Sequence, residues 1–252
     1  MDALNNTHSP TLLMLPGLDG SGILFKPLID LLPLTIRTKI AVIPTILLSG
    51  HKQIAKQILA NLPDGKYVIL AESFSGRTAY ELCRMAPDKF SYVVFIASFV
   101  NRPSYLLRFA LLLPITRIVK SKLIMQLMAK CLFGLNNTKA LLNALFQALS
   151  TLPNACINNR LSILNRLKQP SIRLDVPCFI VTAKQDLLLN RKAQNSIKKV
   201  FSYHAEQQLD GPHFLLQTRA RHCVKIITTL YAGLADVKSP VVPVTIDPTI
   251  AL

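Results

Sequence analysis

The sequence is most informative at Val68-Ile69-Leu70-Ala71-Glu72-Ser73-Phe74-Ser75-Gly76, where an apolar run passes through small residues into a helical pattern. Such a run predicts a strand that is buried inside a sheet. A buried strand that leads directly into a helix is the repeating unit of a parallel sheet wrapped by helices. We therefore expect an α/β fold in which this segment is one of the strands.

The same alternation of short apolar runs and helical patterns continues along the chain. The predicted strands are residues 11–15, 39–43, 67–71, 92–97 and 178–182, with a weaker one at 205–209. The predicted helices are residues 51–62, 75–85, 191–201 and 213–231. This order predicts a mostly parallel central sheet flanked by helices.

The chain of 252 residues has the length of one α/β domain with an insertion. Residues 101–170 have a helical pattern broken by prolines, asparagines and a glycine, so we expect a helical lid there. Residues 1–100 and 171–235 form the expected core. Residues 236–252 are a proline-containing tail that we expect outside the core.

The most apolar stretch, residues 105–133, is interrupted by Pro114 and by charged side chains. The pieces are too short to cross roughly 30 Å of hydrocarbon, so amphipathic helices are the better interpretation. The first ten residues lack the pattern of a secretory signal. Cytoplasmic residence is the simplest expectation.

Positive charge dominates the sequence and concentrates in the expected lid. The chain has 29 Lys and Arg against 13 Asp and Glu, and no acidic residue lies between Asp88 and Asp175. A concentrated positive field attracts acidic partners or anionic surfaces. A generally basic surface that keeps the protein soluble explains the charge almost as well. The candidates for binding a carrier or a headgroup are Arg108, Arg117, Lys120, Lys122, Arg160 and Arg166.

The five cysteines are odd in number, widely scattered and without the CxxC spacing of a zinc or redox site. We expect them to be reduced and mostly buried, and we expect neither a metal nor a cofactor. The absence of tryptophan and of a nucleic-acid motif argues against a nucleic-acid partner.

Ser73 stands where a strand meets a helix, which is the context of a nucleophile elbow. The elbow requires small residues two before and two after the nucleophile, and Ala71 and Ser75 occupy those positions. Were Ser75 the nucleophile, the long side chain of Arg77 would take a cramped position. The alternative is that Ser73 only caps the following helix.

A serine nucleophile requires a histidine to accept its proton and a carboxylate to orient that histidine. Asp186 follows the predicted strand 178–182, whereas Asp175 precedes it at the wrong end of the sheet. His213 follows a Gly-Pro turn after the last predicted strand. Ser73, Asp186 and His213 therefore form the expected catalytic triad, although Asp186 as an ordinary surface loop residue remains an alternative.

The turn Leu15-Pro16-Gly17-Leu18-Asp19-Gly20-Ser21-Gly22 follows the first predicted strand and is rich in glycine. Its backbone can approach a substrate closely, and backbone N–H groups are the usual donors to an oxyanion. We expect the N–H groups of Leu18 and Phe74 to form the oxyanion hole. The turn lacks the spacing of a nucleotide-binding loop.

These segments together resemble the α/β-hydrolase superfamily over residues 11–231. The motifs of the glycine-rich turn, Glu72-Ser73-Phe74-Ser75-Gly76 and Asp210-Gly211-Pro212-His213-Phe214 look like those of small bacterial serine esterases. The layout is also similar to that of pimeloyl-carrier-protein methyl ester esterases, with a compact core and a helical lid. Pro16, Ala71 and Ser75 depart from the usual residues of the superfamily without removing a triad member.

The resemblance and the triad together predict a serine carboxylesterase that works through an acyl-enzyme. The most concrete substrate is the methyl ester of a pimeloyl-acyl-carrier protein in biotin synthesis, because acyl carrier proteins are acidic. A lysophospholipase or lipid esterase at an anionic membrane surface is the first alternative. A non-catalytic binding protein with the hydrolase fold is the second.

Overall fold

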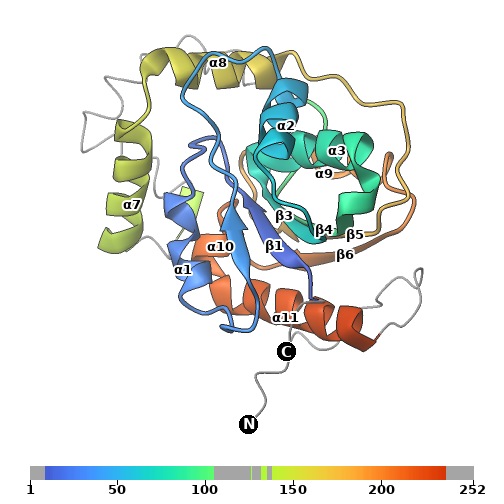
Figure 1. Ribbon diagram of the computed structural model, residues 1–252. Helices are drawn as coiled ribbons and strands as arrows, with labels where there is room; N and C mark the ends of the chain where they lie inside the picture. The colour runs from blue at the N-terminus through green and yellow to red at the C-terminus, as the bar shows by residue number, and fades with distance from the viewer. Residues whose placement is uncertain (1–8, 105–125, 127–131, 135–137, 237–252) are drawn as a thin grey trace.

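A parallel sheet of six strands forms the centre of the computed structural model, which describes residues 9–104, 126, 132–134 and 138–236. The strands are β1 (Thr11–Leu15), β2 (Thr38–Ile40), β3 (Tyr67–Glu72), β4 (Phe90–Ile96), β5 (Cys178–Ala183) and β6 (His204–Leu209), in the spatial order β2-β1-β3-β4-β5-β6. Each neighbouring pair is parallel. The predicted parallel sheet is confirmed (Figure 1).

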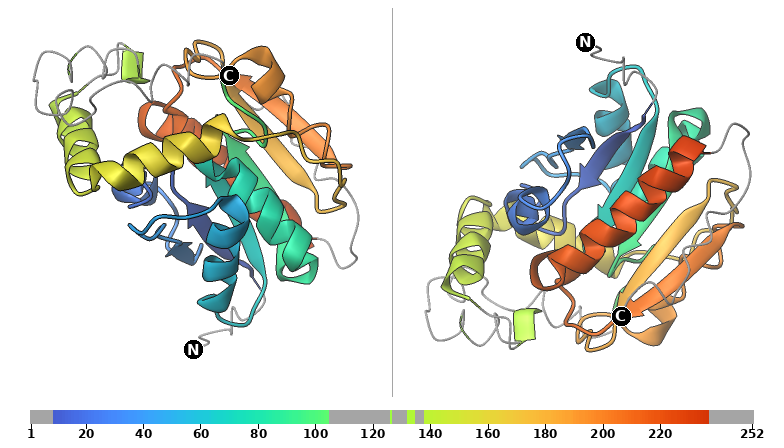
Figure 2. Two further views of the ribbon diagram at one scale, coloured as in Figure 1. Left: turned by 90° about the horizontal axis from the view of Figure 1, so that it is seen from above. Right: turned by 90° about the horizontal axis from the view of Figure 1, so that it is seen from below.

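Helices cover both faces of this sheet (Figures 1 and 2). The longer ones are α2 (His51–Ala60), α3 (Gly76–Met85), α7 (Lys139–Ser150), α8 (Asn154–Asn165) and α11 (Ala220–Asp236). The short ones are α1 (Lys26–Ile29), α9 (Arg191–Gln194), α10 (Leu215–Thr218) and the single turns η1 (Ile23–Phe25), η2 (Ser73–Ser75) and η3 (Pro87–Lys89). Helices α2 and α3 lie on one face, and α11 crosses the other.

Strand alternation divides the apolar side chains between two cores, one on each face. Leu13 and Ile69 pack with residues of α2 and α3, whereas Leu12 and Val68 pack with residues of α1, α10 and α11. All six side chains of β3 are buried. A fully buried Leu or Ile stabilises the fold by about 1.5–3 kcal/mol. Strands that are buried on both faces therefore consist mostly of apolar residues.

Three predicted elements differ from the structure. Strand β2 ends at Ile40 instead of residue 43, because the Ile43 N–H donates to Gly20 O at 2.9 Å. Helix α9 ends at Gln194 instead of residue 201. There the Ser196 hydroxyl donates to Ala193 O at 2.6 Å and accepts the Val100 N–H at 3.0 Å, so it competes with helix continuation.

The predicted helix 213–231 is two helices, α10 and α11, separated at Arg219. Arg219 has a φ of −131°, and its Nε donates to Asp210 O at 2.6 Å. The backbone therefore leaves the helical conformation at this residue while its side chain holds the preceding loop.

The described part of the insertion lies over the loop that follows β1. A small apolar cluster is formed by Leu18 with Leu152, which precedes α8, and with Ile157 and Leu161 of α8, and α7 packs against η1.

Among the described residues, no single helix is both long and apolar enough to cross a membrane. Helices α7 and α8 meet the length and composition only when taken together, and they are bent by 96°. The tail from residue 237 and Cys131 lie outside the described residues. The other four cysteines are free and buried.

Candidate active site

The site lies where the direction of strand succession changes. From β1 the sheet extends to β2 on one side and to β3 and β4 on the other. The loops that leave β1 and β3 therefore diverge at their carboxyl ends, and open parallel sheets bind ligands in the crevice at such a point. The glycine-rich turn follows β1, and Ser73 follows β3.

Ser73 occupies a sharp turn between β3 and α3. Its φ of 45° lies in the left-handed region, which a non-glycine residue seldom adopts and which costs of order 1–3 kcal/mol. Its carbonyl accepts the Ser98 hydroxyl at 2.8 Å. At Gly76, an added Cβ would lie 2.3 Å from Ser98 Oγ and 2.5 Å from Phe99 O. The turn is thus held against the end of β4, and the backbone presents the Ser73 hydroxyl at the sheet edge.

The structure brings together the three residues of the predicted triad. His213 Nε2 lies 2.8 Å from Ser73 Oγ, and His213 Nδ1 lies 2.8 Å from Asp186 Oδ2. The side chains of His213 and Asp186 are 3% and 1% exposed. The other oxygen of Asp186 accepts the N–H groups of Leu188 at 2.8 Å and Leu189 at 3.0 Å. The loop backbone therefore fixes the carboxylate, and the carboxylate orients the imidazole.

This hydrogen-bond chain defines which way a proton can move. A carboxylate on Nδ1 favours the tautomer that carries its proton there, which leaves Nε2 as an acceptor for the Ser73 hydroxyl. As the hydroxyl oxygen attacks a carbonyl, its proton can pass to Nε2, and Asp186 stabilises the resulting imidazolium. The arrangement is suited to acyl transfer.

The turn expected to supply the oxyanion hole is anchored to the Ser73 turn by Ser75. The Ser75 side chain is fully buried, and its hydroxyl donates to Pro16 O. Phe74 is the second residue of η2, where backbone N–H groups lack an intrahelical acceptor. The Leu18 N–H has no acceptor among residues 9–104 or the other described segments. The assignment of Leu18 and Phe74 to the oxyanion hole stays a prediction.

Arg160 has a different position from the one expected of a residue that binds a carrier or a headgroup. Its side chain is 1% exposed, and its guanidinium donates to Leu18 O at 2.7 Å and to Ile43 O and Pro44 O at 3.1 Å each. An added Cβ on Gly20, which has a φ of +69°, would lie 2.5 Å from Arg160 Nη1. Arg160 therefore ties α8 to the turn after β1 and is corrected to a positioning residue.

Of the remaining basic candidates, only Arg166 is among the described residues. Arg166 is exposed at the end of α8. Arg108, Arg117, Lys120 and Lys122 lie outside the described residues. Among the described residues, no group of three or more His, Cys, Asp or Glu side chains is arranged to hold a metal.

Glu72 is a site residue that the sequence interpretation missed. Its carboxyl is buried beside Ser73 and accepts the Gln217 amide at 2.9 Å, and the same amide donates to Leu24 O at 3.1 Å. Burial raises the pKa of Glu72 to about 7, and the nearby carboxylate of Asp19 also raises it, against the opposing effects of Gln217, His213 and the Gly17 N–H. The signal in the sequence was an acidic residue at the end of an otherwise apolar strand.

His51 is a second buried histidine near the same turn. Its Nδ1 lies 2.9 Å from Thr78 Oγ1, and its ring centroid is 4.5 Å from that of Phe74. Desolvation, with a smaller effect of Arg77, lowers the pKa of His51 to about 3. A neutral His51 therefore packs behind Phe74 and does not contact Ser73 through a hydrogen bond.

Solved structures share this architecture. A putative lipase from Acinetobacter baumannii AYE superposes with a TM-score of 0.74 at 19% identity, covering 92% of this chain and 86% of that one. An esterase from Thermogutta terrifontis superposes with a TM-score of 0.70 at 12% identity, covering 90% of this chain and 91% of that one. An epoxide hydrolase superposes with a TM-score of 0.70 at 10% identity, covering 90% of this chain and 93% of that one. No protein-family model and no curated protein matches the sequence. The chain has the α/β-hydrolase fold.

Proposed function

We propose that the protein is a serine hydrolase that cleaves carboxylic esters, with Ser73 as its nucleophile. The observation that carries the proposal is the hydrogen-bond chain from Ser73 through His213 to Asp186 on a strained turn. The fold alone does not decide the chemistry, because it is shared by a putative lipase, an esterase and an epoxide hydrolase. A serine hydroxyl held by an orienting histidine favours acyl transfer.

In the proposed reaction, Ser73 Oγ attacks the ester carbonyl carbon while its proton passes to His213 Nε2. The N–H groups of Leu18 and Phe74 donate to the oxyanion that forms. His213 then gives its proton to the leaving alkoxide, which departs as an alcohol and leaves an acyl-Ser73 ester. Water, deprotonated by His213, attacks this ester, releases the carboxylic acid and restores the hydroxyl. Asp186 stays ionised throughout.

Turnover of p-nitrophenyl butyrate by purified variants tests this proposal. Ser73→Ala and His213→Ala should each lose about a thousandfold or more in kcat, because each removes a member of one proton-transfer unit. Ser150→Ala, a matched change at an exposed serine of α7, should retain wild-type turnover. Undiminished turnover by Ser73→Ala would rule out the assigned nucleophile.

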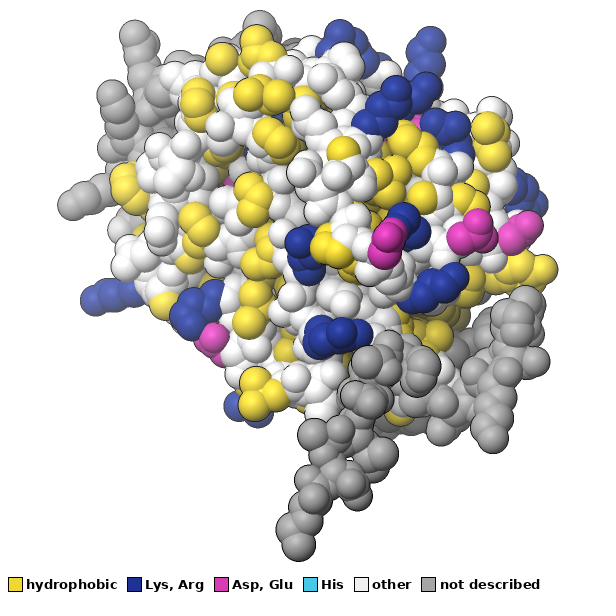
Figure 3. Space-filling view, viewed as in Figure 1, with side chains coloured by type: hydrophobic (Ala, Val, Ile, Leu, Met, Phe, Trp, Pro, Cys, Tyr) yellow, Lys and Arg dark blue, Asp and Glu magenta, His cyan; other side chains and the backbone are white. Residues whose placement is uncertain are grey.

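As the substrate we further propose the methyl ester of a pimeloyl-acyl-carrier protein, acted on in the cytoplasm. The support is charge: the chain carries a formal net charge of +16, and the span between Asp88 and Asp175 has no acidic residue. Figure 3 shows Lys and Arg side chains grouped over one end of α8 and the segment that follows it. An acidic carrier complements such a surface.

Rescue of a biotin-requiring bacterial strain that lacks its esterase tests this substrate. Expression of the wild-type chain should restore growth without biotin, and Ser73→Ala should not. Failure of the wild-type chain to rescue, despite ester hydrolysis in vitro, would separate the substrate proposal from the reaction proposal and reject only the former.

A lipid esterase is the alternative that a specific observation favours. Large apolar side chains are exposed on loops that follow β2 and β5, namely Ile46 at 53%, Leu47 at 64% and Leu187 at 72%. Such side chains, together with positive charge, suit the surface of an anionic membrane. Salt-sensitive binding to phosphatidylglycerol vesicles, with fatty-acid release from lysophospholipid, would favour this alternative over the carrier substrate.

A further inference from the structure

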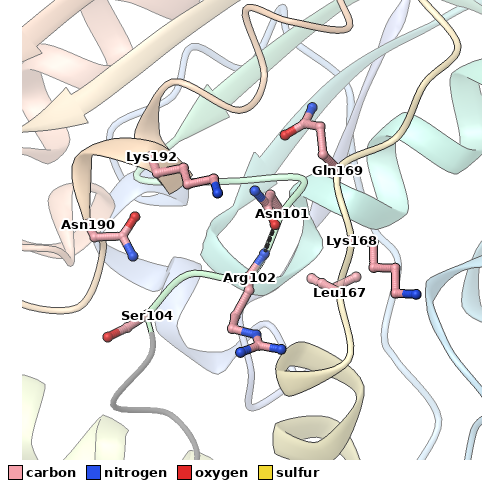
Figure 4. A pocket seen from close by; sticks show the side chains of 8 residues that line it. All are labelled: Asn101, Arg102, Ser104, Leu167, Lys168, Gln169, Asn190 and Lys192. Carbon is pink, nitrogen blue, oxygen red and sulfur yellow. Dashed lines mark hydrogen bonds between the residues drawn. The ribbon is translucent and has the colours of Figure 1, made fainter.

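A hollow lies on the same edge of the sheet as Ser73, beyond the ends of β4 and β5. It has a volume of about 320 Å³ and is bounded by residues 101–104 after β4, 167–169 after α8 and 190–192 at the start of α9 (Figure 4). Asn190 is four residues beyond Asp186. The cavity is therefore separate from the Ser73–His213 contact but adjoins the loop that holds the acid of the triad.

Hydrogen bonds between its walls hold this cavity open. The Asn190 N–H donates to Pro103 O at 3.1 Å, which joins the start of α9 to the segment after β4. Gln169 Nε2 donates to Ser196 O at 3.0 Å, and Arg77 Nη1 donates to Lys168 O at 2.9 Å and to Val100 O at 3.1 Å. The three segments are thus fixed to one another without a ligand.

The lining is cationic. Arg102, Lys168 and Lys192 contribute three positive charges, and none of the lining residues is acidic. Neither Lys168 nor Lys192 forms an ion pair within the described residues. In Figure 4 the ammonium of Lys192 points toward Asn101, whereas that of Lys168 points away from Asn101 and Arg102. The charges of Lys168 and Lys192 are therefore not neutralised by an ion pair within the described residues.

The neutral side chains of the lining also favour an anion. Asn101 Oδ1 accepts the Arg102 N–H at 2.6 Å, and Asn190 Oδ1 accepts the Ala193 N–H at 2.8 Å. Both amide oxygens are thus used by the backbone, which leaves the two NH2 groups as donors. Two amide donors beside three cations suit a ligand rich in acceptors.

We propose that this cavity binds a phosphate group, and that the ester substrate carries that phosphate. A phosphate presents acceptor oxygens in several directions, which matches cations and donors placed on separate walls better than a planar carboxylate does. The substrate part rests on the proposed ester hydrolysis, because only a substrate at Ser73 would link the two sites. The phosphate-binding part does not depend on it.

Titration calorimetry with inorganic phosphate at low ionic strength tests the cavity directly. Lys192→Gln and Lys168→Gln should each weaken phosphate binding about twofold to fivefold, the range for losing one charged contact near a protein surface. Lys52→Gln, at an exposed position of α2, should bind as the wild type does. Absence of phosphate binding by the wild type, or equal weakening in all three variants, would overturn the assignment.

A ratio of rates tests whether the phosphate belongs to the substrate. The quantity is kcat/KM for a phosphorylated butyrate ester divided by kcat/KM for its unphosphorylated counterpart. Lys192→Gln should lower this ratio about fivefold relative to Lys52→Gln. An unchanged ratio, with phosphate binding still weakened, would show that the cavity holds free phosphate and would overturn the substrate part. A wild type without ester turnover would reject the proposed function and leave the calorimetric result standing.

Discussion

Ser75 explains how this chain tolerates a residue other than glycine two positions after the nucleophile. Its hydroxyl bonds Pro16 O and so connects the Ser73 turn to the turn expected to bind the oxyanion. Ser75→Ala removes that connection, which should lower kcat about fivefold to tenfold with little change in KM, since a typical hydrogen bond contributes about 1 kcal/mol. Steady-state kinetics on p-nitrophenyl butyrate measures the effect, with Ser150→Ala as the control. A rise in KM alone would show that Ser75 acts on substrate binding instead.

Glu72 should make the folded protein less stable as the pH rises toward neutrality. Its pKa is raised from 4.5 to about 7, so between these values the folded state keeps a proton that the unfolded state has lost. Stability from this group is therefore full below pH 4.5 and falls by about 1.4 kcal/mol per pH unit up to pH 7.

Glu72→Gln is neutral at every pH and removes this dependence. The free energy of unfolding of Glu72→Gln minus that of the wild type should grow between pH 4.5 and 7 and then level off. Urea unfolding at a series of pH values measures it. A difference that stays constant across this range would contradict a raised pKa at Glu72.

The triad residues could be found from the sequence because their positions follow from strand order. Ser73 comes directly after β3, Asp186 comes three residues after the end of β5, and His213 comes after the last strand. The structural roles of Arg160 and Glu72 could not be found this way. A charged residue inside an apolar pattern indicates burial or function, but its partners, such as Leu18 O or Gln217, are distant in sequence and depend on the packed fold.

At the scale of elements, Arg160 joins α8 to the loops after β1 and β2. Arg160→Met would leave three backbone carbonyls without their donor in a buried position, so we expect a loss of about 2–4 kcal/mol in the free energy of unfolding. Arg160→Lys should recover only part of it, because one ammonium cannot reproduce the planar fork. Thermal or urea unfolding measures both, and Arg166→Met is the matched control on the same helix. Equal stability of Arg160→Met and Arg166→Met would contradict the role.

The elements themselves were predictable where hydrophobic pattern alone determines them. The bounds of β1 match those predicted, and the other strands begin and end near theirs except for the end of β2. The C-terminal end of α9 and the break before α11 were not predictable, because they depend on Ser196 bonding Val100 and on Arg219 bonding Asp210. Local pattern favours a continuous helix at both places, and tertiary hydrogen bonds end it.

At the scale of the whole molecule, buried His51 should limit stability in acid. Its pKa is lowered from 6.5 to about 3, so the unfolded chain binds a proton over this range and the folded protein does not. Stability should therefore fall by about 1.4 kcal/mol per pH unit as the pH decreases below 6.5. His51→Gln should reduce this slope, and His222→Gln, at an exposed position of α11, should not. Equal slopes in both variants would show that other groups control acid unfolding.

The six-stranded sheet places Ser73, His213 and Asp186, which lie far apart in the sequence, within one hydrogen-bond chain. The most direct test of its chemical meaning is covalent labelling with a fluorophosphonate probe, followed by mass spectrometry of the digested protein. We predict one adduct, on the peptide that contains Ser73, with labelling greatly slowed in His213→Gln and absent in Ser73→Ala. An unlabelled wild-type protein, or an adduct on a different serine, would contradict the assignment of Ser73 as an activated nucleophile.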